Sequence, residues 1–280
     1  MFLLSKTYMR CISHCLSLSI LFVSPFALSE TENILSQTNQ NITSEALILS
    51  VNEPMYFIVG GSDDTKARFQ FSFKYRIFDN ESNFINKQSW LKGLHFSYTQ
   101  TSLWNLSKNS APFEDSSYKP SFFWDNETHQ KNFLPQFIRT GFEHESNGQT
   151  DEKSRSINTL YFWPFWRGKR QGNDWLIGPK FYYYLTKDEF NDDIEKYRGY
   201  VDLWLRYGKE DSWLISSILR HGESDHSMIQ LELSYPVRNQ ILARTGGYLY
   251  LQIFQGYGET MLTYNQKQDA QIRIGFSIVR

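Results

Sequence analysis

Apolar and polar residues alternate with a period of two over much of the chain. The segment KARFQFSFKYRIF places large apolar side chains at every second position from Phe69 to Ile77, with Gln, Ser, Lys and Arg between them. Successive side chains of a β-strand point to opposite faces, so this pattern predicts a strand with one apolar and one polar face. The alternation returns in YVDLWLRYG, MIQLELSYP and QIRIGFSIV, which begin at Tyr200, Met228 and Gln271. An all-β chain is therefore predicted.

Further segments have the length and composition of strands. They lie at 92–101, 119–125, 133–146, 154–165, 174–186, 212–220, 246–255 and 258–265, which brings the prediction to about twelve strands. No amphipathic helix is predicted after the first residues of the chain.

Two architectures fit such strands. A soluble sandwich directs its apolar faces inward, whereas a membrane barrel directs them outward to lipid and lines its lumen with the polar faces. Several predicted strands have about ten or more residues, which suits a tilted crossing of a bilayer. Trp and Tyr near strand ends, as at Trp90, Trp175 and Trp213, are typical of membrane interfaces. We therefore expect an antiparallel transmembrane β-barrel.

The first residues have the pattern of a secretory signal peptide. Lys6 and Arg10 precede an apolar run from about Leu16 to Val23, and residues 27–29 supply a cleavage site. The run is shorter than the roughly 20 residues that a membrane-spanning helix needs. We expect a signal peptide at 1–29, a polar leader at 30–55 that is mobile or plugs the barrel loosely, and an outer-membrane β-barrel domain at 56–280.

Charge and cysteine content narrow the function classes. The formal net charge is −1, so the basic excess of a typical nucleic-acid-binding protein is missing. Both cysteines, Cys11 and Cys15, fall in the predicted signal peptide. The mature chain would then hold no disulfide, and its stability must come from backbone pairing and packing.

The stretch GFEHESNGQTDEKSRSINTLYFWP, beginning at Gly141, carries the candidate chemistry. His144 and Ser146 are two residues apart, so on a strand they share one face, and a hairpin about Asp151 places Asn158 opposite His144. Their face is otherwise apolar, whereas the opposite face holds most of the charges of this hairpin. The face of His144 and Ser146 also carries Ile138, Phe142, Leu160 and Phe162, and the opposite face carries Arg139, Glu143, Glu145, Arg155 and Thr159.

Polar side chains on a lipid-facing wall cost free energy unless they bond to one another. Catalysis gives a reason for their presence: Ser146 as nucleophile, His144 as the general base, and Asn158 as the residue that orients the imidazole. The alternative is a set of polar side chains at the barrel mouth, near the lipid headgroups, without a catalytic role.

The motifs HESNG and SRSINTLY resemble the active-site signature of the bacterial outer membrane phospholipase A family. SYTQTSLWNLSKNSAPF, LSYP and QGYGETMLTYN are similar to other blocks of that family, so the resemblance spans nearly the whole mature chain. It implies a twelve-stranded barrel in the outer membrane that hydrolyses acyl esters of membrane phospholipids, as phospholipase A1 and A2 and as lysophospholipase. It also implies Ca²⁺ as cofactor and a homodimer as the active form.

The resemblance assigns roles to further residues. The backbone N–H of Gly148 would hold the oxyanion. Calcium would be bound by Ser154 and the carbonyl of Gln149 from one subunit, and by Ser110 of the partner subunit. Gln100 matches a polar residue of the dimer interface, although its residue type alone fits an ordinary lumen position.

Some features depart from the family pattern or favour other functions. Gln149 stands where the best-known members have Arg, and the chain ends in Arg280 where outer membrane barrels usually end in an aromatic residue. The acidic segment 187–193 could bind a second calcium, but we interpret it as a solvated loop. The competing hypotheses are a non-catalytic pore or structural barrel of the outer membrane, and a soluble lipid-binding sandwich.

Overall fold

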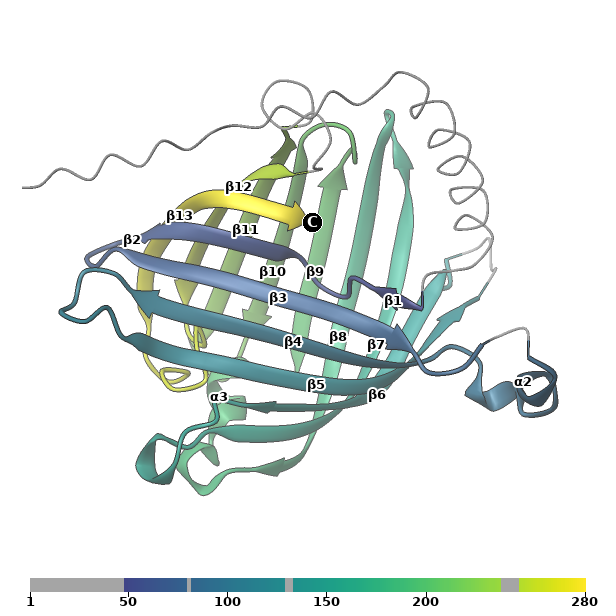
Figure 1. Cartoon of the computed structure of the whole chain (residues 1–280), viewed down its shortest axis with the longest axis horizontal. Helices are drawn as coiled ribbons and strands as arrows, with labels where there is room; N and C mark the ends of the chain where they lie inside the picture. The colour runs from purple at the N-terminus through teal and green to yellow at the C-terminus, as the bar shows by residue number, and fades with distance from the viewer. Residues whose placement is uncertain (1–47, 80–81, 129–132, 238–246) are drawn as a thin grey trace, which may run out of the picture. The chain divides into compact units, whose positions relative to one another are not determined.

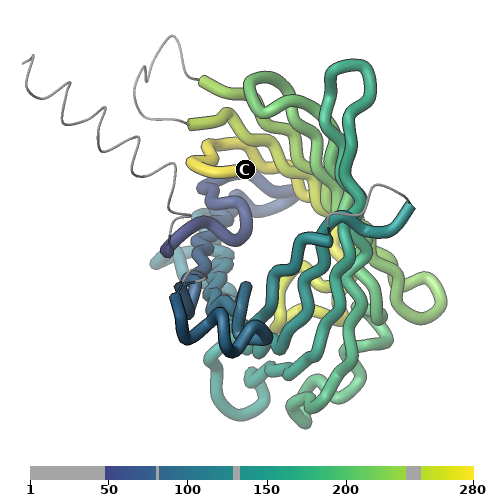
Figure 2. Tube along the Cα trace, turned by 90° about the vertical axis from the view of Figure 1, so that its right-hand side faces the viewer, coloured from purple at the N-terminus to yellow at the C-terminus, as the bar shows by residue number. Residues whose placement is uncertain are grey.

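The structure is a computed structural model that describes residues 48–79, 82–128, 133–237 and 247–280. Within these residues, twelve antiparallel strands, β2 to β13, form a closed barrel (Figures 1 and 2). Consecutive strands are neighbours, and the last strand, β13, pairs with β2. Closure gives backbone N–H and C=O groups partners within the sheet, as a bilayer requires. The predicted fold class is confirmed.

The strands differ in length, and β7 and β8 are among the longest. The short β1 pairs with the end of β3, in line with β2. The strand bounds are β1 (Leu49–Ser50), β2 (Met55–Gly61), β3 (Lys66–Arg76), β4 (Leu94–Asn105), β5 (Phe113–Glu127), β6 (Phe137–Ser146), β7 (Ser156–Arg170), β8 (Asn173–Lys187), β9 (Val201–Gly208), β10 (Leu214–His221), β11 (Ser227–Pro236), β12 (Tyr248–Gly256) and β13 (Gln268–Val279).

Helical elements in the described residues are short and lie in the connections between strands. They are α2 (Asn83–Lys87) and α3 (Ile194–Arg198), with the 3₁₀ turns η1 (Ser89–Leu91), η2 (Asp151–Lys153) and η3 (Glu189–Asn191). None of the helices in the described part of the chain has the length and apolar character needed to span a membrane.

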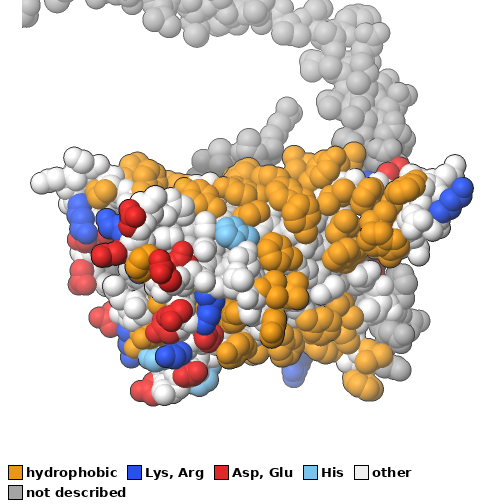
Figure 3. Space-filling model, turned by 90° about the horizontal axis from the view of Figure 1, so that it is seen from below, with side chains coloured by type: hydrophobic (Ala, Val, Ile, Leu, Met, Phe, Trp, Pro, Cys, Tyr) orange, Lys and Arg blue, Asp and Glu red, His pale blue; other side chains and the backbone are white. Residues whose placement is uncertain are grey.

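The outward face of the barrel is apolar. In β13, Ile272, Ile274 and Phe276 are 53%, 56% and 59% exposed, whereas Arg273 between them is fully buried. Figure 3 shows hydrophobic side chains covering much of one side of the wall, with charged side chains gathered toward the left-hand end. A soluble sandwich would bury its apolar faces. The outward apolar face therefore confirms the predicted membrane barrel and excludes the sandwich.

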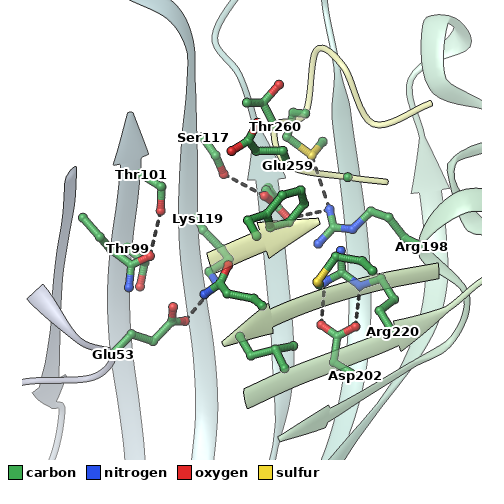
Figure 4. A pocket seen from close by; sticks show the side chains of 18 of the residues that line it. Glu53, Thr99, Thr101, Ser117, Lys119, Arg198, Asp202, Arg220, Glu259 and Thr260 are labelled. Carbon is green, nitrogen blue, oxygen red and sulfur yellow. Dashed lines mark hydrogen bonds and ion pairs between the residues drawn. The ribbon is translucent and has the colours of Figure 1, made fainter. Parts of the chain in front are cut away.

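Charged side chains line the lumen and pair with one another (Figure 4). Glu53 Oε1 lies 2.9 Å from Lys119 Nζ, and Asp202 Oδ1 lies 2.5 Å from Arg220 Nε. Buried charges are costly when they lack partners, so this pairing explains how the polar strand faces remain inside. The side chains surround a cavity of about 140 Å³.

Residues 51–54, between β1 and β2, contribute to the lumen. Arg139 Nη1 donates a hydrogen bond to Asn52 Oδ1 (2.8 Å), and the backbone N–H of Glu53 donates to Ser72 Oγ (3.1 Å). The last residues of the predicted polar leader therefore pack inside the barrel. The expected signal peptide at 1–29 and the leader up to residue 47 lie outside the described residues.

The strand β2 is absent from the sequence-based prediction. Its sequence, MYFIVGG, is apolar at nearly every position, so it shows no alternation. In the barrel, Tyr56 and Ile58 are buried against Tyr250, while Phe57 is exposed. Both faces of this strand are thus apolar, but for different reasons: the inner face packs against Tyr250, and the outer face contacts lipid.

The predicted strand at 258–265 is wrong, because this segment is a loop between β12 and β13. Its apolar residues Met261 and Tyr264 are buried and pack with Ile157 and Ile194. The pattern of large residues in this segment reflects packing between loops rather than a membrane strand.

Replacing Ile274 with Arg would place a charge on the outward face of β13. We expect Ile274→Arg to lower the free energy of unfolding by about 2–4 kcal/mol if the side chain lies near the bilayer midplane. Urea titration in phospholipid vesicles measures this change, and Ile274→Val serves as the control with a loss below about 1.5 kcal/mol. An arginine variant as stable as the valine variant would show that this face does not contact lipid.

Candidate active site

His144 and Ser146 lie on the outward wall of the barrel, at the end of β6 that leads into the loop 147–155. Their outward neighbours Leu160 and Phe162 are 47% and 46% exposed, whereas Glu143 on the other face is 7% exposed. The predicted assignment of the two faces of this hairpin is confirmed.

The pairing of β6 with β7 places Asn158 directly opposite His144. His144 Nδ1 lies 2.9 Å from Asn158 Oδ1, so a protonated Nδ1 donates to the amide oxygen. Nε2 is then free of that proton and can accept one. Asn158 Nδ2 in turn donates to Thr186 Oγ1 on β8 at 2.7 Å. The predicted hairpin register is confirmed, and Thr186 is a contact that the sequence analysis missed.

Ser146 lies two residues after His144 on the same strand and pairs with Ser156 of β7 and Tyr118 of β5. In the described part of the chain, no hydrogen bond joins Ser146 Oγ to His144. Such catalytic hydrogen bonds are often long without substrate and shorten when it binds. The structure thus brings the three predicted triad residues to adjacent positions on one face.

The loop 147–155 is held by Asn147, which is almost fully buried. Its Oδ1 accepts the backbone N–H groups of Gln149 (3.3 Å) and Arg155 (2.9 Å), and its Nδ2 donates to the Lys153 carbonyl (2.9 Å). Gly148 has φ = +65°, the left-handed region that favours glycine, and a Cβ there would lie 3.0 Å from the Tyr118 ring. The sequence signal for this turn is the Asn-Gly pair.

The predicted calcium ligands lie on two connections. Gln149 and Ser154 belong to the loop 147–155, and Ser110 belongs to the connection between β4 and β5. Ser154 Oγ donates to Asp188 Oδ2 at 2.8 Å, and Asp188 Oδ1 accepts the backbone N–H of Phe190 (2.9 Å). Asp188 comes from the acidic segment that we interpreted as a solvated loop, yet it is tied to the site.

Carboxylates are sparse around this position. No group of three or more His, Cys, Asp or Glu side chains that could hold a metal occurs among the described residues. The candidate metal ligands are the Ser154 hydroxyl and the Gln149 backbone carbonyl on the loop, and the neighbouring carboxylate of Asp188. All of them offer oxygen atoms, the ligands that calcium prefers.

A groove of about 290 Å³ lies on the wall beside the loop. Gln100, Tyr118, Gly148 and Gln149 line it together with Phe113. Gln100 is paired with Tyr118, which is paired with Ser146, so the three form one row across β4, β5 and β6. The alternative that Gln100 is a lumen residue is wrong, since it shares the outward groove.

The lumen face of β6 is anchored by ion pairs. Lys180 Nζ lies 3.1 Å from Glu143 Oε2, and Arg198 Nη1 lies 2.9 Å from Glu145 Oε2. Burial alone would lower the pKa of Arg198, but the charge of Glu145 beside it raises that pKa above its ordinary value. Because Glu143 and Glu145 flank His144 in sequence, these pairs fix the strand that presents the imidazole.

The fold and this set of side chains define a transmembrane β-barrel of the outer-membrane type that carries a Ser-His-Asn arrangement on its outward wall. The family model described as Phospholipase A1 matches residues 24–278. The chain therefore belongs to the phospholipase A1 family, and the predicted family resemblance is confirmed.

Relatives and solved structures agree with this assignment. The chain is 34% identical to a phospholipase A1 of Klebsiella pneumoniae and 32% identical to one of Escherichia coli K12, over 65% of its own length. It spans 61% and 60% of the length of those relatives.

Two solved structures share the fold. The outer membrane phospholipase A from Escherichia coli gives a TM-score of 0.70 at 24% identity, and the Salmonella typhi outer membrane phospholipase dimer with bound calcium gives 0.71 at 25%. Each comparison covers 86% of this chain and 96% of the other. The protein is accordingly an outer membrane protein, as predicted.

Removing Lys180 would leave the Glu143 carboxylate without its partner inside the barrel. We expect Lys180→Met to lower the free energy of unfolding by about 3–5 kcal/mol, as measured by urea titration in detergent micelles. The control is Lys169→Met, which breaks an exposed ion pair with Asp174 and should change stability by about 1 kcal/mol or less. Equal effects of both variants would contradict the role of the buried pair.

Proposed function

We propose that the protein hydrolyses acyl esters of membrane phospholipids as an outer membrane phospholipase A1 and A2, and also acts as a lysophospholipase. The observation that carries this proposal is the 2.9 Å contact between His144 Nδ1 and Asn158 Oδ1 on a lipid-facing wall, with Ser146 beside it on the same strand. An unreactive barrel surface has no need of a hydrogen-bonded imidazole among exposed Leu and Phe side chains.

In the proposed reaction, Ser146 Oγ attacks the ester carbonyl carbon while His144 Nε2 takes its proton. The glycerol oxygen leaves with the proton from His144, and the acyl group remains on Ser146. A water molecule, deprotonated by His144, then attacks the acyl carbon, which releases the fatty acid and restores the serine. Asn158 Oδ1 accepts the hydrogen bond from His144 Nδ1–H throughout and keeps Nε2 directed at the reacting groups.

The negative charge that develops on the ester oxygen needs donors near Ser146. The backbone N–H of Gly148 is the proposed donor, and the left-handed φ of this residue supports a loop shape that favours glycine. Bound calcium would supply positive charge close to the same oxygen.

The donors on the loop 147–155 fit calcium. Ser154 Oγ and the Gln149 carbonyl would bind it from one subunit, and Ser110 of the partner subunit would complete the set. Asp188, 2.8 Å from Ser154 Oγ, adds the negative charge that neutral oxygens lack. With so few carboxylates in the set, calcium would be held weakly.

The active form would be a homodimer. A shared calcium requires two subunits, and the groove beside the loop 147–155 would be completed by the second wall. The outward position of Gln100 in that groove supports its proposed place at the interface. Export to the outer membrane would depend on the signal peptide proposed at 1–29.

A non-catalytic pore is the second candidate, and the lumen argues against it. Lys119 on β5 pairs with Glu53 of the segment 51–54 inside the barrel, and the cavity that these side chains line holds only about 140 Å³. An open channel would require this pair to separate, which leaves both charges without partners.

Ser146→Ala tests the nucleophile directly. Wild-type protein in mixed micelles of phosphatidylcholine and detergent should release fatty acid, and the variant should lose about a thousandfold or more in turnover because no acyl-serine can form. Ser217→Ala, on the wall at β10, should keep wild-type turnover. Hydrolysis by the Ser146→Ala variant at the wild-type rate would contradict the proposal that Ser146 is the nucleophile of a phospholipase.

Chelation tests the calcium site. Addition of EDTA to the micellar assay should abolish turnover, and excess calcium should restore it. Ser154→Ala should raise the calcium concentration required for half-maximal turnover by roughly tenfold, since one ligand is removed. Ser212→Ala, at the opposite end of the barrel, should leave that concentration unchanged. Full turnover in EDTA would contradict the calcium requirement.

A further inference from the structure

The pairing of β7 with β8 contains an irregularity beside the triad. Asn158 is paired with Thr186, but the next residue, Thr159, is paired with Tyr184. Leu185 is therefore an extra residue in β8, which is the definition of a β-bulge. Without the bulge, Leu185 would stand opposite Asn158.

The bulge also changes which side chains face outward. Tyr183 and Leu185 are exposed on the wall at 67% and 45%, and Thr186, directly after Leu185, is exposed as well. Two successive outward side chains break the alternation of a regular strand. As a result, a hydroxyl rather than a leucine methyl group lies next to the amide of Asn158.

The Thr186 hydroxyl accepts a hydrogen bond from the N–H side of the Asn158 amide. Asn158 Oδ1 faces His144 Nδ1 at 2.9 Å, and Asn158 Nδ2 donates to Thr186 Oγ1 at 2.7 Å. On a wall that contacts lipid, an amide N–H without an acceptor is costly, and the side chain would rotate to find one. Such a rotation would withdraw Oδ1 from the imidazole.

From this geometry we infer that Thr186 is a positioning residue of the active site. It acts through Asn158: by accepting the hydrogen bond from Nδ2–H, Thr186 Oγ1 holds the amide plane in the orientation that places Oδ1 next to His144 Nδ1. The bulge at Leu185 is the backbone device that brings the hydroxyl there. The inference rests on the proposed hydrolase function, because positioning has meaning only if His144 serves as base.

Thr186→Val, which keeps the shape of the side chain and removes the hydroxyl, is the central test. We expect kcat in the micellar assay to fall roughly three- to tenfold, with little change in KM, because one hydrogen bond to the catalytic machinery is lost. Thr186→Ser should restore kcat to near the wild-type value. Urea titration should show both variants folded, so that a loss of fold is recognised.

Thr140→Val is the matched control. It makes the same change at an outward threonine on β6, whose Oγ1 donates to the Tyr161 carbonyl at 3.1 Å, away from the triad. Its kcat should equal that of the wild type. A comparable fall in this variant would show that any outward hydroxyl has the same effect, and would overturn the inference.

A double-mutant cycle separates positioning from a general structural effect. If Thr186 acts through Asn158, Thr186→Val should have no further effect on residual turnover in the Asn158→Ala background. The inference fails if the valine substitution lowers kcat equally in both backgrounds, or if it leaves the wild-type background unchanged. Failure of the hydrolase function itself would appear separately, as wild-type protein without Ser146-dependent turnover.

Discussion

The period of two along each strand of a closed sheet is the constraint on which the whole molecule depends. Closure satisfies the backbone within the wall, so each side chain has only two destinations, the lumen or the lipid. Consecutive residues of β6 therefore perform unlike tasks: Glu143 and Glu145 anchor the strand from inside, while His144 and Ser146 project outward. A shift of the pairing by one residue would exchange these tasks and destroy both.

Much of this arrangement can be predicted from the sequence. Alternation is a local property, so the faces of the hairpin around Asp151 and the pairing of His144 with Asn158 follow from spacing alone. Alternation did not predict the strand β2, because both faces of that strand are apolar. It wrongly predicted a strand at 258–265, because packing between loops uses the same residue types as a membrane wall. Periodicity cannot distinguish apolar residues that face lipid from those that face protein.

The contacts around the triad were harder to predict, for a different reason. Thr186 is 28 residues from Asn158 in sequence, and a bulge decides which residue of β8 meets the amide. Asp188 reaches Ser154 from an acidic segment whose composition is that of a solvated loop. Bulges and loop conformations arise from tertiary packing, so residue types alone do not reveal them. The family resemblance supplied the metal-ligand assignments, which stand as proposals.

The seam between β2 and β13 has a consequence for assembly. Gly60 lies so close to β13 that a Cβ would approach the Ile272 carbonyl oxygen to 2.1 Å. This seam joins segments more than two hundred residues apart, so its formation has one of the highest entropic costs of loop closure in the barrel. Until it forms, both end strands present unpaired backbone edges that can pair with other chains. Gly60 allows the two backbones this close approach, and the wall loses its free edges only when β13 pairs with β2.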